Sequence, residues 1–155
     1  MRRNVQIAAL SSVLAFGIAS LAHAQTWKRG HGNGHDYIEI ASQRAGASLR
    51  IECGDGPQLW LRYYPPRTWN GAGKVSVRAG SYISAMEIDG GDGALLSNLP
   101  NNGIGMASAL VNALKESQSL VIEGAATARV ALGQRSFTLP DGRNMIAQLE
   151  KRCAR

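Results

Sequence analysis

Two histidines and a carboxylate lie close together early in the chain, as His31, His35 and Asp36. Imidazole and carboxylate groups bind transition metals, and two histidines four residues apart would share one face of a helix. Three glycines in and around this spacing, Gly30, Gly32 and Gly34, disfavour that helix, because glycine costs about 1 kcal/mol in a helix interior. We therefore expect no metal site and no cofactor.

The same segment is poorly suited to catalysis. A catalytic histidine needs a rigid support and an orienting partner, and a glycine-rich stretch offers neither. The sequence also lacks the G-x-S-x-G, H-E-x-x-H and C-x-x-C motifs. Eleven scattered acidic residues leave a carboxylate-based hydrolase open as an alternative, although no pair stands out. We expect a protein that is not an enzyme.

Tryptophan, tyrosine and arginine gather in the stretch from residue 60 to residue 69. Trp60, Arg62 and Tyr64 alternate along an expected strand, and Arg67 and Trp69 follow soon after. These residue types are enriched at the energetic centres of protein interfaces. If the intervening residues face the core, the first three face outward and form a candidate binding surface. The alternative is that a helix or a second sheet covers this face and makes Trp60 a core residue.

A β-hairpin over residues 47–64 would position these side chains. Two alternating runs flank a Gly-Asp-Gly-Pro turn, which is a typical hairpin pattern. Ser48, Arg50 and Glu52 are expected on the outer face, because successive strand residues point to opposite sides. The residues expected on its core face are Leu49, Ile51, Cys53, Leu59, Leu61 and Tyr63.

Residues 1–24 have the features of a secretion signal. Arg2 and Arg3 form a basic start, an apolar run follows over residues 7–21, and Ala22-His23-Ala24 matches a cleavage site before Gln25. The apolar run is short for a membrane span, so none is expected after cleavage. The protein is therefore predicted to be periplasmic or secreted.

Export would place the two cysteines of the chain, Cys53 and Cys153, in an oxidising compartment. Two thiols there predict one disulfide. It would close a loop of about 100 residues, for which chain entropy predicts roughly 4.7 kcal/mol of stabilisation.

The remaining patterns predict a mainly β, α+β fold. Residues 25–36 are expected to form a flexible glycine-rich arm, and residues 37–155 a single domain. We predict an antiparallel β-sandwich or half-barrel of seven to nine strands, with a middle helix and a C-terminal helix. The expected strands cover residues 37–43, 48–53, 59–64, 74–78, 81–89, 94–97, 119–123, 128–132 and 135–139, the last two joined by a turn at Gly133-Gln134.

Both helices show an apolar stripe with helical spacing. The middle helix is expected to start at an Asn101 or Asn102 cap and to end near Lys115. The C-terminal helix is expected to start at an Asp141 cap. The residues expected on the two inward stripes are Met106, Ala107, Leu110, Val111, Leu114, Met145, Ile146, Leu149 and Cys153.

The charge distribution bears on possible partners. The whole chain carries a net charge of +6, which loss of Arg2 and Arg3 would lower by two. Its arginines are spread out rather than clustered, which disfavours nucleic acid binding. A protein or an anionic envelope polymer is the expected partner.

Short motifs also follow one another in a suggestive order. An L-x-[IV]-x-C strand at residues 49–53 precedes a middle helix, and an F-x-L-x-G-like segment at residues 137–142 leads into a helix ending in Cys153. Pro140 interrupts that segment and Ala154 follows the last cysteine. The order resembles type VI secretion-associated periplasmic accessory proteins and, more distantly, invasion-associated locus B proteins. The resemblance implies a non-enzymatic β-domain with a disulfide in the Gram-negative envelope, and carries over no catalytic residue.

A second resemblance covers residues 53–63. This segment is similar to periplasmic lysozyme inhibitors of the membrane-bound C-type class, which insert a Ser-Gly-x-x-Tyr loop into the enzyme's cleft. The nearest match here, Gly80-Ser81-Tyr82, departs from that motif. A lysozyme inhibitor is therefore the alternative function.

Overall fold

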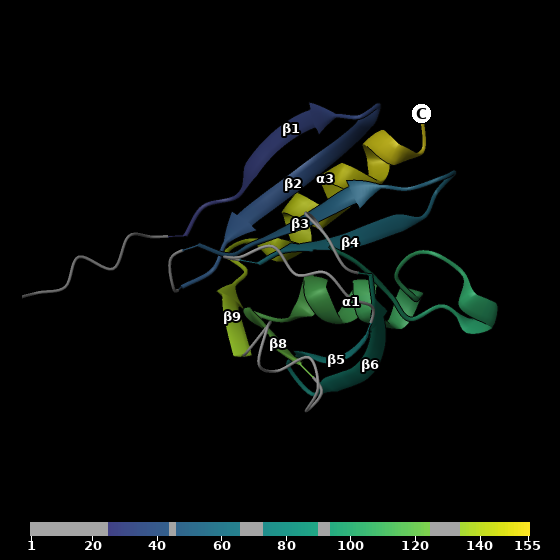
Figure 1. Ribbon diagram of the computed structural model, residues 1–155. Helices are drawn as coiled ribbons and strands as arrows, with labels where there is room; N and C mark the ends of the chain where they lie inside the picture. Colours follow the sequence, from purple (N-terminus) through teal and green to yellow (C-terminus); the bar gives the residue numbers. More distant parts are fainter. Residues whose placement is uncertain (1–24, 44–45, 66–72, 90–93, 125–133) are drawn as a thin grey trace, which may run out of the picture.

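The computed structural model describes residues 25–43, 46–65, 73–89, 94–124 and 134–155 (Figure 1). Strands dominate these ranges. The elements are β1 (Lys28–Gly32), β2 (His35–Ala41), β3 (Ser48–Cys53), β4 (Leu59–Tyr64), β5 (Gly73–Ala79), β6 (Tyr82–Ile88), β7 (Ala94–Ser97), the 3-10 helix η1 (Pro100–Asn102), α1 (Ser108–Glu116), β8 (Ser119–Gly124), β9 (Gln134–Thr138) and α3 (Gly142–Cys153).

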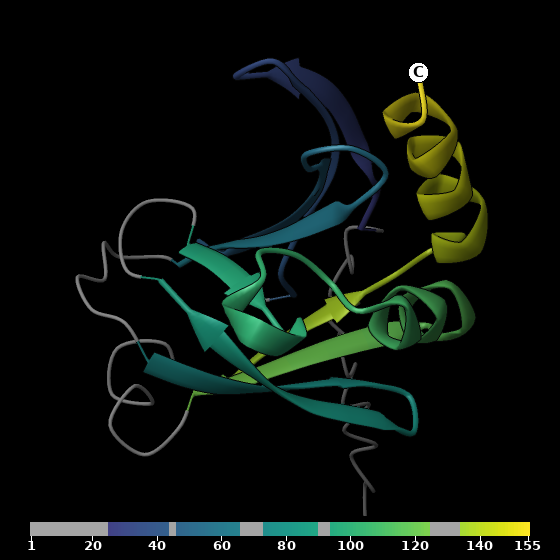
Figure 2. The same cartoon turned by 90° about the vertical axis from the view of Figure 1, so that its right-hand side faces the viewer.

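All nine described strands belong to one antiparallel sheet in the order β1-β2-β3-β4-β7-β6-β5-β8-β9. The sheet curls into a half-barrel whose two halves enclose the core, and α1 and α3 lie along one side (Figure 2). Helix α3 packs on β2 and β3, and α1 packs on α3, β5 and β6. The predicted mainly β half-barrel with a middle and a C-terminal helix is confirmed.

Contacts of Gln25 and Gln43 join the C-terminal end of β2 to the edge strand β9. The backbone N–H of Gln43, just after β2, donates to the carbonyl of Ser136 in β9 at 3.2 Å. The Gln25 amide donates to the carbonyl of Ala41 at 2.6 Å and accepts from the N–H of Thr138 at 2.9 Å. We call these contacts the glutamine seam. They satisfy backbone groups at the open edge of β9, which would otherwise be available to another strand.

The core face of the central hairpin agrees with its alternation. All six residues predicted to face the core are buried. Glu52 lies on the outer face as its alternation predicts, although only 6% of it is exposed to solvent. It points away from the core, and neighbouring side chains on the outer face cover it.

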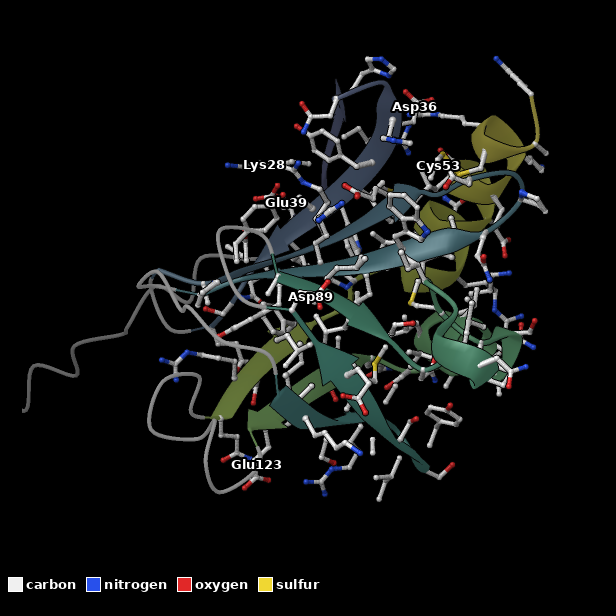
Figure 3. All side chains as sticks on the ribbon, turned by 45° about the vertical axis from the view of Figure 1, so that its right-hand side comes forward. Lys28, Asp36, Glu39, Cys53, Asp89 and Glu123 are labelled. Atoms are coloured by element: carbon white, nitrogen blue, oxygen red, sulfur yellow. A yellow bond between two sulfur atoms is a disulfide. The ribbon has the colours of Figure 1, made fainter. Side chains whose placement is uncertain are left out.

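The predicted disulfide is present. It joins Cys53, the last residue of β3, to Cys153, the last residue of α3, with Cα atoms 5.2 Å apart and a sequence separation of 100 (Figure 3). The bond fastens the terminal helix to the central hairpin.

The expected irregular arm is a β-hairpin instead. Strands β1 and β2 pair antiparallel through a two-residue turn at Asn33-Gly34, both with positive φ (51° and 82°). Asn-Gly favours this primed turn, because both residues tolerate the left-handed conformation. Gly30 also has a packing role, since a Cβ there would lie 2.3 Å from the Tyr37 ring. The glycines that suggested flexibility therefore allow strand pairing.

The predicted cap of the middle helix is wrong. Helix α1 begins at Ser108, whereas Asn101 lies in η1 with φ 58°. The residue that supports its start is Asn98, whose side-chain oxygen accepts from the N–H of Ala107 at 2.8 Å. The stripe of Leu110, Val111 and Leu114 is buried as predicted, along with Met106.

The C-terminal helix begins where predicted, but not by the expected capping bond. Asp141 occupies the cap position with φ 52°, and its side chain makes no capping hydrogen bond to the backbone. Its carboxylate accepts instead from the Asn144 side chain at 2.9 Å. Met145, Ile146 and Leu149 are buried as predicted.

The sequence predicted Gly133-Gln134 as the turn of a hairpin, but Gln134 is the first residue of a strand. Gln134 lies in β9 opposite Glu123, so β9 pairs with β8. Residues 128–132 lie outside the described residues, as does Gly133.

Within the described ranges, neither helix has the length and apolar character needed to cross a membrane.

Candidate binding surface on the outer face of the sheet

Seven side chains form a connected group on the outer face of β2, β3 and β4. Cross-strand register places six of them in two rows and the seventh, Tyr64, opposite Ser48 in the next row, because directly opposed residues of an antiparallel pair share a face. Figure 1 views this part of the sheet with α3 behind it. We call the group the outer cluster; it comprises Tyr37, Glu39, Arg50, Glu52, Trp60, Arg62 and Tyr64.

Arg50 is the centre of the first half of the outer cluster. Its Nε and Nη2 atoms both donate to Glu39 Oε2, at 2.9 and 2.7 Å. Its guanidinium carbon lies 3.8 Å from the centre of the Tyr37 ring and 4.9 Å from that of the Tyr64 ring. One cation thus contacts two aromatic rings and a carboxylate, which fixes all four side chains.

The electrostatics of this half follow from partial burial. Burial lowers the pKa of Arg50, but the hydrogen bond to Glu39 and the nearby Tyr64 and Tyr37 outweigh it, so the pKa is raised overall. Burial raises the pKa of Tyr64, while Arg50 opposes that rise. At neutral pH the surface therefore presents the charged Arg50 guanidinium beside the neutral phenol of Tyr64.

Glu52 and Trp60 organise the second half. The Glu52 side chain is 7% exposed and forms an ion pair with Arg62 Nε. The indole of Trp60 lies against the backbone of Gly54, where a Cβ would be 2.3 Å from its Nε1. The centre of the His35 ring lies 5.4 Å from that of the indole. Trp60 is therefore half-buried within the outer face and is not a core residue.

Part of the predicted surface is thus assembled by the fold. Trp60, Arg62 and Tyr64 share the outer face as expected, while Arg67 and Trp69 lie outside the described residues. The sequence prediction missed Tyr37 and Glu39. Both could have been found from their alternation with the apolar Ile38 and Ile40 in β2, since that pattern puts them on the outer face.

This arrangement suits binding more than chemistry. Each arginine of the outer cluster already has a carboxylate partner, so the surface has both signs of charge in fixed positions. Side chains held in one geometry lose little conformational entropy when a partner docks. Lys28 extends the same face onto β1, opposite Glu39 (Figure 3).

The structure separates the three residues considered as metal ligands. His31 Nδ1 and Asp36 Oδ1 lie 2.9 Å apart across β1 and β2. His35 points to the opposite face of β2, toward Trp60. Among the described residues, no three His, Cys, Asp or Glu side chains are arranged to hold a metal ion.

A cavity of about 500 Å³ lies between the β3–β4 turn, α1 and α3. Two carboxylates, Asp55 and Glu150, line it with Gln58 and Asn112. Both Glu150 oxygens contact Lys115 Nζ, at 2.8 and 2.6 Å. Glu150 thereby joins α3 to α1 at the wall of this cavity.

The nearest match to the inhibitor loop, Gly80-Ser81-Tyr82, lies at a tight turn. Gly80 (φ 59°) and Ser81 connect β5 to β6. The Tyr82 hydroxyl accepts from Asn98 Nδ2 at 3.2 Å, which keeps this side chain against the sheet. A two-residue turn offers little chain for insertion into a cleft.

Comparison of the chain with protein-family models, curated proteins and solved structures finds no significant match. The candidate surface is therefore judged on its geometry.

Proposed function

We propose that this chain is a non-catalytic binding or accessory protein of the bacterial envelope, and that it binds a protein or an envelope polymer through the outer cluster. Export by the predicted signal over residues 1–24 would bring it to the periplasm or the medium. The short motifs similar to envelope accessory proteins support this assignment.

One observation carries the proposal. Two arginines, two carboxylates and three aromatic rings are fixed by mutual contacts on a sheet face that the described helices do not cover. The opposite face is the hydrophobic core. Aromatic and arginine side chains in a fixed arrangement are typical of interface hot spots.

Affinity capture with single substitutions tests the proposal. Immobilised wild-type protein, Trp60→Ala and Ile83→Ala are incubated with envelope extract from cells that express the protein. Ile83 is a matched control, because it is an apolar side chain that is 65% exposed on β6, away from the outer cluster. We expect Trp60→Ala to lower retention of the partner about tenfold or more, while Ile83→Ala retains it.

Two parallel measurements determine whether the partner is a protein or a polymer. Protein partners are identified in eluates by mass spectrometry, and polymer binding is measured by co-sedimentation with purified sacculi. Circular dichroism and urea unfolding show whether each variant is folded. Equal retention by folded Trp60→Ala and wild type in both arms would refute the proposal, and so would unfolding of Trp60→Ala, since Trp60 would then serve the fold.

A further inference from the structure

The sheet has two edge strands, β1 and β9, and contacts between described residues cover only one of them. At β9 the glutamine seam occupies backbone groups of Ser136 and Thr138. Strand β1 forms the opposite rim of the sheet (Figure 1) and pairs with β2 on one side. On its other side it has no backbone partner within the described ranges. An open edge presents unpaired N–H and C=O groups, which can pair with an added strand.

The turn at Asn33-Gly34 determines which groups of β1 point to the open edge. A two-residue turn of this type is closed by a hydrogen-bonded pair, here Gly32 and His35. Hydrogen-bonded and non-bonded pairs alternate along an antiparallel ladder, so Arg29 and His31 belong to non-bonded pairs. The N–H and C=O groups of these two residues therefore point away from β2.

The side chains along this edge are basic. Lys28 and Arg29 are exposed, and β1 contains no carboxylate. Arg29 Nη2 donates to Gln148 Oε1 on α3 at 2.6 Å, and Arg152 lies about one turn beyond Gln148 on the same side of the helix. None of these three cations forms an ion pair with a carboxylate in the part of the chain that the structure describes.

These charges discriminate between possible added strands. A second copy of the chain would add a β1 with two cations and no carboxylate, and like charges on facing strands destabilise their pairing. An extended segment with acidic side chains at alternate positions would instead bring carboxylates to the face of Arg29 and Arg152, because directly opposed residues share a face. Backbone bonds would hold such a segment, and the charges would select it.

We propose that β1 binds an extended acidic peptide segment of another protein, which adds to the sheet as a new edge strand. The N–H and C=O groups of Arg29 and His31 bond to the backbone of the segment, and Arg29 and Arg152 pair with its carboxylates. This surface is separate from the outer cluster, since Trp60 lies on β4, beyond β2 and β3. The proposal goes beyond binding by the outer cluster and does not depend on it.

Amide hydrogen exchange, followed by NMR, tests where a peptide binds. Purified protein is titrated with a synthetic peptide that alternates glutamate and valine, and with the same peptide carrying lysine in place of glutamate. We expect the glutamate peptide to slow exchange at the amides of Arg29 and His31, and to change the amide of Gly30 less, because that amide already bonds to β2. The lysine peptide should bind about tenfold more weakly or worse, because its charges are repelled.

Two substitutions at one position test the backbone contact. His31→Pro removes the outward N–H and keeps the pairing with β2, because an edge strand tolerates proline where the nitrogen faces solvent. His31→Ala loses the same imidazole but keeps the N–H, so it is the matched control. We expect His31→Pro to weaken the dissociation constant of the glutamate peptide about tenfold or more relative to His31→Ala, measured by calorimetry. Circular dichroism shows whether both variants are folded.

Side-chain variants test the charges and cover failure of His31→Pro to fold. Arg29→Gln and Arg152→Gln should each weaken binding of the glutamate peptide and reduce its dependence on salt. Arg78→Gln removes an exposed arginine on β5 and should bind like wild type. Trp60→Ala should also bind like wild type, which separates this edge from the outer cluster.

Several results would overturn the proposal. One is unchanged exchange at the amides of Arg29 and His31 when the glutamate peptide is added. Another is equal binding of the lysine peptide, or of the glutamate peptide by folded His31→Pro and His31→Ala. Protection of the same amides in concentrated protein without peptide would assign the edge to a second copy of this chain.

Discussion

At the scale of single residues, two glycines explain how aromatic side chains lie on the outer face. Gly30 and Gly54 each leave space that an aromatic side chain fills, Tyr37 in the first case and Trp60 in the second. The missing Cβ lets each ring approach the backbone closely, and the rings in turn cover charged neighbours. This explains why Glu52 is buried on a face that alternation assigns to solvent.

Two alanine substitutions in β1 test this packing. A Cβ at Gly30 would lie 2.3 Å from the Tyr37 ring, whereas a Cβ at Gly32 would lie 3.6 Å away, in ordinary contact. We expect Gly30→Ala to be less stable than Gly32→Ala by about 1 kcal/mol, because the displaced ring loses its contact with Arg50. Both variants replace a glycine by alanine, so the effect of this replacement on the backbone entropy of folding cancels when their stabilities are compared.

Urea unfolding of the two variants measures that difference. Equal stabilities would show that Tyr37 moves at no cost, and the stacked arrangement around Arg50 would then contribute nothing measurable.

At the scale of elements, the glutamine seam closes the half-barrel. It joins the end of β2 to β9 through Gln25 and Gln43, which also donates from its side chain to Thr138 Oγ1 at 2.9 Å. Trp27 extends the contact, since its indole N–H donates to the Pro140 carbonyl at 2.8 Å. The residues that directly follow the predicted cleavage site thus belong to the fold.

Gln25→Ala tests the contribution of this seam. The substitution leaves the Ala41 carbonyl and the Thr138 N–H without their amide partner, so we expect stability to fall by about 1–2 kcal/mol. Hydrogen exchange should quicken most at the Thr138 amide. Gln118→Ala removes an exposed glutamine and is the control. Unchanged exchange at Thr138 in Gln25→Ala would contradict a closing role.

At the scale of the whole molecule, one covalent bond joins the central hairpin to the end of the chain. The bond spans 100 residues, so its main effect is to restrict the unfolded chain. Helix α3 is held at the same time by its apolar stripe on β2 and β3 and by the Lys115–Glu150 ion pair with α1. The native layout therefore does not depend on the disulfide alone.

Replacing both cysteines by serine tests whether the noncovalent contacts of α3 keep the native layout without the disulfide. We expect the double variant to keep the native circular dichroism spectrum but to lose roughly 2–5 kcal/mol of stability in urea. Reducing agent should lower the stability of wild type and leave the variant unchanged. Thiol titration of native protein should find no reactive sulfhydryl. Two titratable thiols in protein isolated from the periplasm would contradict the bond.

The sequence by itself determined which residues face the core and which cysteines pair. Alternation with period two assigns faces locally, and two cysteines allow one pairing. Tertiary structure decided the order in which β7 and β6 follow β4, the burial of Glu52, and the meeting of Gln25 with β9. These features depend on contacts between residues far apart in the chain, which short-range patterns of polarity do not encode. The hairpin at Asn33-Gly34 is different, because its turn signal was local and was outweighed by the surrounding glycines.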